Sequence, residues 1–161
     1  MKKSITLILG FFFLVNISFG QQNEKKVYLK AGNGKYLVMQ YDAQGNPTGM
    51  KAIADSAKKA TVFLYKGNKD IFSNNGFNDK FMIMDLKSNA YIDPQYDGTL
   101  KFYTNRDKGA LMNFSRTPNV LEIHGMKSIL YIDKDGNAGC CYDGKGIPTG
   151  ANSKFTIELV K

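Results

Sequence analysis

The sequence predicts an all-β domain made of three similar units, each with four short strands, or about twelve strands in all. Beyond the N-terminus, no long segment shows the 3.6-residue apolar period of an amphipathic helix, and the best helical candidate is the short Ile53–Ala60. Short β-branched, aromatic and aliphatic runs alternate instead with clusters of Gly, Asn, Asp and Pro. The stretch Val27–Tyr36, VYLKAGNGKY, is echoed twice, in segments that end at Tyr91 and Tyr131.

The N-terminus has the layout of a secretory signal peptide. A basic pair, Lys2-Lys3, precedes the nearly continuous apolar run Ile5–Ile17, and small residues occupy the −3 and −1 positions of a cleavage point after Gly20. The apolar run is shorter than the ~20 residues that a membrane-spanning helix needs. We therefore expect residues 1–20 to be removed and the mature chain to be secreted or periplasmic.

The mature chain, residues 21–161, has a length typical of one domain. Without Lys2-Lys3 it holds 20 basic and 14 acidic residues, a net charge of +6. This charge favours approach to anionic surfaces such as phosphate, acidic glycans or lipid headgroups. The lysines are scattered and no nucleic-acid-binding motif accompanies them, so no nucleic-acid partner is expected.

The two cysteines, Cys140 and Cys141, are adjacent. Neighbouring Cα atoms lie about 3.8 Å apart, closer than the ~4.4–6.8 Å of an ordinary disulfide, so a bond between the two would be strained. On one strand their side chains would point to opposite faces. Two cysteines without matched His or Cys partners make a poor metal site, so we expect no metal and no cofactor.

The three units span residues 26–66, 80–116 and 119–160, and 67–79 is an inserted loop between the first two. In unit one the predicted strands are Val27–Lys30, Lys35–Gln40, Met50–Ala54 and Thr61–Lys66. In unit two they are Phe81–Asp85, Ala90–Asp93, Leu100–Thr104 and Leu111–Arg116. In unit three they are Val120–His124, Ile129–Asp133, Ala138–Tyr142 and Lys154–Leu159.

Features shared by the units support this alignment. The turn Asp42–Asn46 matches Asp133–Asn137, and Asp97-Gly98 is the counterpart in unit two. Tyrosines stand at comparable places in the units, and each closing strand alternates apolar with polar residues, which indicates one inward and one outward face. The matched tyrosines are Tyr36, Tyr91 and Tyr131. The inward residues of the closing strands are Phe63 with Tyr65, Met112 with Phe114, and Phe155 with Ile157 and Leu159.

Two motifs carry a family resemblance, the opening LKAGNGKYLV at Leu29–Val38 and the closing ATVFLYK at Ala60–Lys66. They resemble the β-trefoil superfamily, in particular its fascin-like, actin-crosslinking-like branch. In unit two Lys87-Ser88-Asn89 replaces the Asn-Gly-Lys of that motif. The resemblance implies three units that close on each other, which buries their apolar faces and removes exposed strand edges. A lipocalin-like barrel is the alternative, but it would not produce a threefold repeat.

The sequence lacks the combinations of residues that catalysis needs. The single histidine, His124, falls on a predicted strand, and a pairing with Cys140 or Cys141 as nucleophile has no third, orienting residue. Three of the acids, Asp97, Asp135 and Asp143, directly precede a glycine, a turn position where carboxylates accept hydrogen bonds from backbone amides. Asp133–Asn137 places oxygens at alternate positions but lacks the terminal bidentate acid of a calcium loop. We therefore expect neither an enzyme nor a metal site.

Recognition is the function class that remains. A Tyr-Asp dipeptide occurs once per unit near a turn, as Tyr41-Asp42, Tyr96-Asp97 and Tyr142-Asp143. An aromatic ring beside an acid suits the apolar C–H face and the hydroxyls of a sugar. The chain has no Trp, so the Gln-x-Trp element of ricin-type glycan-binding trefoils is absent. The sequence predicts a secreted, non-catalytic module that binds carbohydrate or cell-surface glycan through these six residues.

Three alternatives stay open, the third being an enzyme with His124 in a pocket beside a cysteine or a carboxylate. The tyrosines of these pairs could cover the ends of the barrel, with each aspartate starting a turn. The protein could also bind a protein partner, for example as a protease inhibitor, with 67–79 as the projecting element. The actin bundling of fascins is not expected, because it needs several trefoils in tandem and this chain has one.

Overall fold

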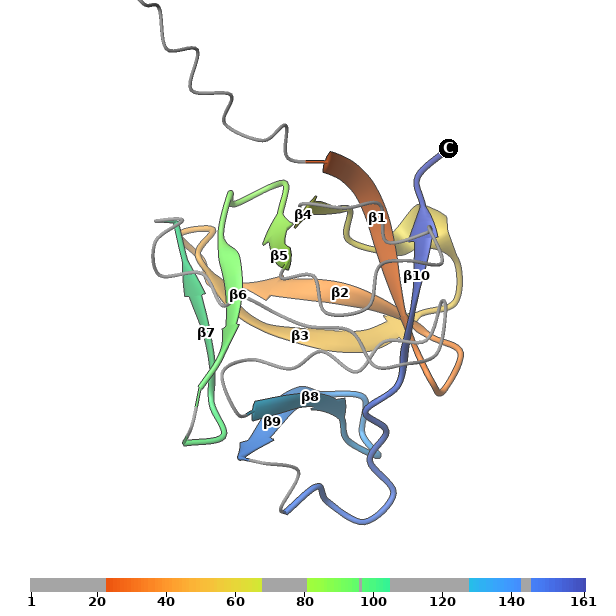
Figure 1. The fold of residues 1–161 in the computed structure, drawn as a ribbon, viewed down its shortest axis with the longest axis vertical. Coiled ribbons are helices and arrows are strands. Elements are labelled where there is room, and N and C mark those ends of the chain that lie inside the picture. Colours follow the sequence, from red (N-terminus) through yellow and green to blue (C-terminus); the bar gives the residue numbers. More distant parts are fainter. Residues whose placement is uncertain (1–22, 68–80, 96, 105–127, 143–145) are drawn as a thin grey trace, which may run out of the picture.

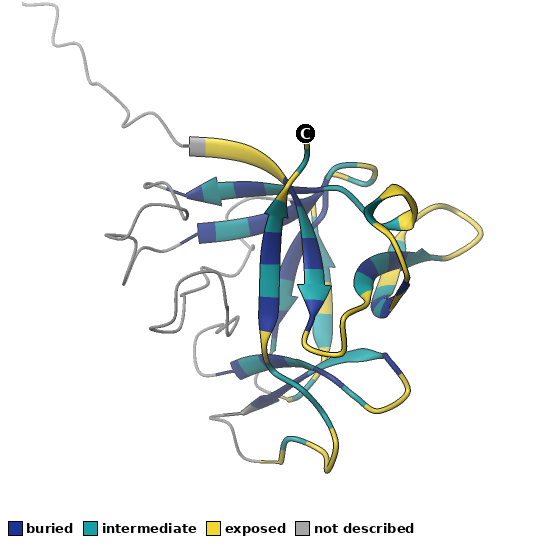
Figure 2. Ribbon diagram, turned by 90° about the vertical axis from the view of Figure 1, so that its right-hand side faces the viewer, coloured by how far each residue is buried: buried dark blue, intermediate teal, exposed yellow. Residues whose placement is uncertain are grey.

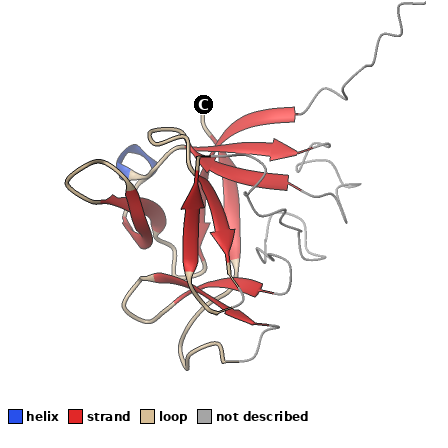
Figure 3. Ribbon diagram, turned by 90° about the vertical axis from the view of Figure 1, so that its left-hand side faces the viewer, coloured by secondary structure: helices blue, strands red, loops and turns tan. Residues whose placement is uncertain are grey.

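The computed structural model of the protein describes residues 23–67, 81–95, 97–104, 128–142 and 146–161, with Asn23 and Tyr142 described in their backbone only. These residues form strands joined by tight turns, with a single 3-10 turn (Figures 1 and 3). The elements are β1 (Asn23–Ala31), β2 (Tyr36–Tyr41), β3 (Pro47–Ala54), η1 (Ala57–Lys59), β4 (Phe63–Gly67), β5 (Phe81–Asp85), β6 (Tyr91–Pro94), β7 (Leu100–Tyr103), β8 (Ser128–Ile132), β9 (Ala138–Tyr142) and β10 (Phe155–Leu159).

The strand predictions are confirmed wherever the structure describes the chain, since every predicted strand there overlaps an observed one. Leu111–Arg116 and Val120–His124 lie outside the described residues. The helical candidate Ile53–Ala60 is wrong in extent, because Ile53 and Ala54 end β3 and only Ala57–Lys59 turn. Within the described residues no helix has the length and apolar character needed to cross a membrane.

Strand β1 organises the main sheet by pairing with three other strands. Its first half pairs with β4, from Asn23↔Gly67 to Val27↔Phe63, and its second half pairs with β10, from Val27↔Leu159 to Ala31↔Phe155. It also meets β2 at Lys30↔Tyr36. The sheet runs in the order β3-β2-β1-β4-β5-β6-β7, and β8 pairs with β9 in a separate hairpin (Figure 1).

Alternating side chains separate a packed interior from an outer face (Figure 2). The pattern buries Phe63 and Tyr65 in β4, and Phe155 and Ile157 in β10, as predicted. Leu159 does not follow the prediction: it is 46% exposed, because it ends β10 at the rim of the interior. Other buried core residues are Val27, Leu29, Leu37, Met39, Met50, Phe81, Ile83, Ile92, Leu130 and Ile132. Each fully buried side chain of this size contributes about 1.5–3 kcal/mol to folding.

The first hairpin turn confirms the interpretation of Gly32-Asn33-Gly34. Lys35 O accepts a hydrogen bond of 2.8 Å from Ala31 N, and Gly34 lies at φ +82°. In unit two the corresponding turn is closed by Asp85 N and Ala90 O at 2.9 Å, and Asn89 takes the positive φ, +56°. Asn tolerates this left-handed conformation better than other non-Gly residues. Unit two therefore keeps a positive-φ residue directly before the closing residue, in a turn that is one residue longer.

The second turn of each unit joins β2 to β3, β6 to β7 or β8 to β9. Its backbone hydrogen bonding is the same in all three units, which agrees with the predicted correspondence of these turns. In all three, a backbone amide donates to the carbonyl four residues on: Asp42 to Asn46, Gln95 to Thr99 and Asp133 to Asn137, each at 2.9 Å. The glycines of these turns have φ of +83°, +85° and +83°, a region that favours glycine. These glycines are Gly45, Gly98 and Gly136.

The three second turns join the units by different chemistry. In unit three, Gly136 O accepts a hydrogen bond of 2.7 Å from Ala52 N of unit one. In unit two, Gln95 O accepts the Ser128 hydroxyl of unit three at 2.9 Å. In unit one, the residue before the turn, Tyr41, donates its hydroxyl to unit two. The units are therefore linked in a closed cycle.

The matched tyrosines are only partly equivalent. Tyr36 and Tyr91 each form the first pair beside their hairpin turn, with Lys30 and Met84. In the second hairpins, Tyr36 and Tyr91 form the pairs farthest from the turn, with Ala54 and Tyr103, whereas Tyr131 pairs with Gly139, one pair away from the turn. A Cβ at Gly139 would lie 2.7 Å from the Tyr131 ring, so the glycine makes room for it. The prediction of three equivalent tyrosines is wrong for Tyr131.

Candidate recognition surface

Tyr41, the first predicted site residue, serves the contact between units one and two. Its hydroxyl donates to Asp85 Oδ2 at 2.8 Å, and Lys87 Nζ lies 4.0 Å from its ring centroid. Asp85 is fully buried. Burial first, and the hydrogen bond to Asp85 second, raise the pKa of Tyr41 above its ordinary value. The hydroxyl and one ring face of Tyr41 are thus already engaged inside the protein.

Asp42 and Asp97 organise their own turns. Asp42 Oδ1 accepts hydrogen bonds from Gln44 N at 3.0 Å and Asn46 N at 2.8 Å, and Oδ2 accepts from Asn46 Nδ2 at 2.9 Å. Asp97 Oδ1 accepts from the Thr99 amide at 2.9 Å and the Thr99 hydroxyl at 2.5 Å. The hydrogen bonds from Asn46 and Thr99 hold the pKa of each carboxyl below its ordinary value.

The three Tyr-Asp pairs do not occupy matching positions. Asp42 is the first residue of its turn, whereas Asp97 is the third residue of the turn Gln95–Thr99. Tyr142 ends β9, away from the second turn of its unit. Tyr96, Asp143 and the Tyr142 side chain lie outside the described residues, as do His124 and residues 68–79 of the inserted loop. Their predicted roles stay predictions.

Asp133 repeats the arrangement of Asp42. Its Oδ1 accepts from Asp135 N at 2.9 Å and Asn137 N at 2.8 Å, and its Oδ2 accepts from Asn137 Nδ2 at 3.1 Å. The oxygens that a calcium ion would need are thus bonded to the turn itself. Across the described part of the chain, no three His, Cys, Asp or Glu side chains are grouped to hold a metal ion.

The cysteines are free thiols, and both are buried. Cys140 Sγ lies 3.0 Å from Thr99 O and 3.4 Å from Gln95 O, beneath the second turn of unit two. Burial raises the pKa of the Cys140 thiol to about 11. An activated nucleophilic cysteine has a lowered pKa, so this site opposes a catalytic role.

The free energy of unfolding at alkaline pH should depend on the Cys140 thiol. Because the folded pKa of about 11 lies above the ordinary value of 9.0, the stabilising contribution is complete below pH 9 and is lost as pH rises through 11. Urea unfolding of the wild type and Cys140→Ser at pH 8, 9, 10 and 11 checks this, since lysine titration affects both proteins alike. We expect the advantage of the wild type to shrink above pH 9. A constant difference up to pH 11 would contradict the assigned environment.

An exposed group of aromatic and charged residues lies on the outer side of β1 and β10. Because alternate residues of a strand point to opposite faces, burial of Val27, Leu29, Phe155 and Ile157 turns their neighbours outward. Tyr36 of β2 adjoins them through its pairing with Lys30. We call this surface the β1–β10 face; its residues are Lys26, Tyr28, Lys30, Tyr36, Lys154, Thr156 and Glu158.

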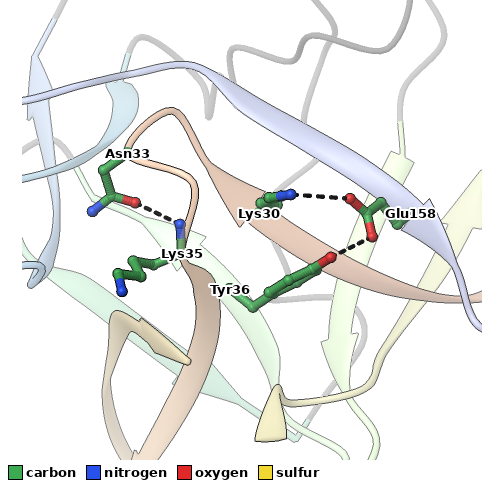
Figure 4. A network of polar contacts seen from close by, with 5 residues as sticks. All are labelled: Lys30, Asn33, Lys35, Tyr36 and Glu158. Atoms are coloured by element: carbon green, nitrogen blue, oxygen red, sulfur yellow. Dashed lines mark hydrogen bonds and ion pairs between the residues drawn. The ribbon is translucent and has the colours of Figure 1, made fainter. Parts of the chain in front are cut away.

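Side chains on the β1–β10 face hold one another in place (Figure 4). The Tyr36 hydroxyl donates to Glu158 Oε2 at 2.7 Å, and Lys30 Nζ lies 3.7 Å from Glu158 Oε1. The Tyr28 and Tyr36 rings meet edge to face, with centroids 6.2 Å apart at 82°. Lys30 Nζ is also 5.1 Å from the Tyr36 ring centroid. The four side chains form a fixed, half-exposed group.

The turn beside this face is also braced. Asn33 Oδ1 accepts a hydrogen bond of 3.0 Å from Lys35 N, and Lys35 Nζ forms an ion pair with Asp55 (Figure 4 shows the first of these contacts). Sequence reasoning missed this surface. The signal was present in the alternation of VYLKA and FTIEL, which puts Tyr28 and Glu158 opposite the core residues.

Comparison with known proteins gives the fold its name. No protein-family model matches the sequence, and no curated protein matches it. Among solved structures, a Gallus interleukin-1 beta mutant superposes with a TM-score of 0.61 at 8% identity, over 85% of this chain and 97% of that chain. This chain is a β-trefoil. At such identity the likeness shows the fold alone, and it confirms the predicted fold class.

Within the trefoil, the hairpins β2–β3, β6–β7 and β8–β9 gather together, since β3 contacts both β7 and β9, and β7 contacts β9. The second turns belong to this assembly. The β1–β10 face lies instead on the ladder that joins the first and last strands of the trefoil (Figure 1). The described turn residues Tyr41, Asp42 and Asp97 and the β1–β10 face are therefore different parts of the molecule.

Proposed function

We propose that this trefoil is a non-catalytic recognition module that binds carbohydrate through the β1–β10 face. The observation that carries the proposal is the fixed pair of half-exposed tyrosines, Tyr28 and Tyr36, with an acid and an amine beside them. A tyrosine ring offers an apolar surface to the C–H face of a sugar. Glu158 and Lys30 supply an acceptor and a donor for sugar hydroxyls.

Preorganisation supports this role. Tyr36 is tied to Glu158 and Tyr28 rests against Tyr36, so a ligand would order few side chains on binding. Ordering a flexible side chain costs about 0.5–1.5 kcal/mol in binding free energy. The described Tyr-Asp residues lack such a ring pair, and the Tyr41 hydroxyl bonds to the fully buried Asp85, whereas Glu158 stays partly exposed.

A non-catalytic role is supported by the state of the reactive groups. Burial raises the pKa of Cys140 to about 11, which keeps the thiol protonated at neutral pH. Both carboxylate oxygens of Asp133 accept hydrogen bonds within its own turn, Oδ1 from two backbone amides and Oδ2 from the Asn137 side-chain amide. Both features favour recognition over chemistry.

Location and branch are part of the same proposal. The signal-peptide layout of residues 1–20 supports a secreted or periplasmic mature chain, which would meet glycans outside the cell. The opening Asn33–Leu37, NGKYL, and the closing strand Phe63–Lys66 support a place in the fascin-like branch of the trefoils.

Removing the Tyr28 ring tests the site. We expect Tyr28→Ala to weaken glycan binding about tenfold, because an aromatic contact of this kind contributes about 1 kcal/mol or more. A glycan array with the mature chain identifies ligands, and calorimetric titration then compares the variants. Tyr96→Ala and Asp97→Ala are matched controls that target the predicted turns, and we expect them to bind like the wild type.

Two results would redirect the proposal. Loss of binding in Tyr96→Ala, with Tyr28→Ala unaffected, would move the site to the turns. An array without any bound glycan would contradict carbohydrate recognition and favour the protein-partner alternative, whose projecting loop 67–79 can be tested by deletion and pull-down.

A further inference from the structure

We infer that the ligand of the β1–β10 face is an anionic glycan, bearing sulfate or carboxylate groups, that lies along β1 and contacts Lys26 and Lys154. The inference rests on the proposed function, because it names the class of carbohydrate that the face takes. The whole sequence carries a net charge of +8. The lysines of this face show on which surface part of this positive charge is exposed.

Lys26 and Lys154 stand at opposite ends of the β1–β10 ladder. Val160 N donates to Lys26 O at 3.0 Å at one end, and Gly32 N donates to Lys154 O at 2.9 Å at the other. Between them, Tyr28 faces Glu158 and Lys30 faces Thr156. At about 3.3 Å per residue, the two ends of this row lie about 20 Å apart.

Among the described residues, these two lysines differ from Lys30, which shares their face, in forming no ion pair. Lys30 pairs with Glu158, Lys35 with Asp55 and Lys66 with Glu24. Lys26 and Lys154 are exposed, and neither forms an ion pair with any other residue that the structure describes. The acid of the face, Glu158, is bonded to Tyr36 and Lys30, so both ends of the row remain positive.

The distance between Lys26 and Lys154 favours an extended polyanion over a small anion as the ligand. Two cations about 20 Å apart are separated by more than the ~8–10 Å Debye length at physiological salt, so each acts on its own part of a ligand. One phosphate or sulfate ion cannot reach both. A sulfated or carboxylated chain can, and Tyr28 lies between the lysines as a platform for one of its sugar rings.

The test compares matched polymers on matched variants. Wild type, Lys26→Gln/Lys154→Gln and Lys101→Gln/Lys134→Gln are titrated with dextran sulfate, carboxymethyl dextran and uncharged dextran at 50 and 300 mM NaCl. Lys101 and Lys134 are exposed on β7 and on the second turn of unit three, so the control pair removes equal charge elsewhere. We expect the first pair to weaken binding to a charged dextran about tenfold, the control pair less than twofold, and 300 mM salt to weaken wild-type binding.

Each outcome decides the inference. A tenfold loss confined to Lys26→Gln/Lys154→Gln supports it, and the stronger of the two charged polymers identifies sulfate or carboxylate. Equal losses in both pairs would show a net-charge effect and overturn it, as would the absence of binding to either charged dextran. Binding of neutral glycans that depends on Tyr28 but not on the lysines would also overturn it, while leaving the proposed function intact.

Discussion

Replacing Asp85 with alanine is expected to lower the free energy of unfolding by about 3 kcal/mol, or the melting temperature by roughly 10 °C. Asp85 is fully buried at the junction of units one and two. Its Oδ2 accepts hydrogen bonds from the Tyr41 hydroxyl at 2.8 Å, the Ser88 amide at 2.9 Å and the Ser88 hydroxyl at 2.5 Å. Its removal leaves several donors without an acceptor in the interior, where such a loss is most costly.

A double-mutant cycle separates the contact between units from the local turn. Tyr41→Phe keeps the ring under Lys87 and removes only the hydroxyl, so we expect a loss of about 1 kcal/mol. In the Asp85→Ala background the same change should have almost no effect, because the acceptor is already gone. Chemical denaturation of the four proteins measures this. Effects that simply add would contradict the contact between Tyr41 and Asp85.

Replacing Gly136 with alanine is expected to destabilise the trefoil by about 3 kcal/mol, against about 1 kcal/mol for Gly45→Ala. Both glycines have φ of +83°, so both substitutions meet the same backbone strain. At Gly136 the added Cβ would also lie 3.2 Å from Ala52 O, whereas at Gly45 nothing lies within 4 Å. Ala52 cannot easily withdraw, because its amide donates to Gly136 O at 2.7 Å.

The comparison of these two variants isolates packing between units from turn conformation. Gly98→Ala provides a third point, since its Cβ would lie 3.2 Å from Cys140 O and its φ is +85°. We expect it to behave like Gly136→Ala when melting temperatures are measured side by side. Equal losses for all three variants would mean that only backbone strain matters and that the turns do not brace neighbouring units.

Local pattern was enough to predict most of the fold. Strand β5 falls on the predicted Phe81–Asp85, and the turns Asp42–Asn46 and Asp133–Asn137 share their predicted geometry. These features depend on residues close in sequence, where periodicity and glycine placement act directly. The threefold repeat in the sequence then predicts the number of units, because the pattern of a single strand does not indicate how many strands the fold contains.

The roles of individual polar residues could not be predicted in the same way. In the sequence Asp85 is only the last residue of a predicted strand, and nothing local indicates that Tyr41 of unit one donates a hydrogen bond to it. The role of Glu158 likewise depends on the hydrogen bond that it accepts from Tyr36, which lies far away in the chain. Such contacts form only when the three units pack against each other, so the spacing of residues in the sequence does not predict them.

The double pairing of β1 has a consequence for the order of folding. Its first half can pair with β4 as soon as unit one exists, but its second half pairs only after Phe155–Leu159, about 125 residues further along the chain, has been made. Contacts between such distant segments make folding slow. Until β10 pairs there, the backbone of residues 27–31 is an open edge on which a second copy of the chain could place its own β10. The β1–β10 pairing therefore also protects the folded chain from association with a second copy.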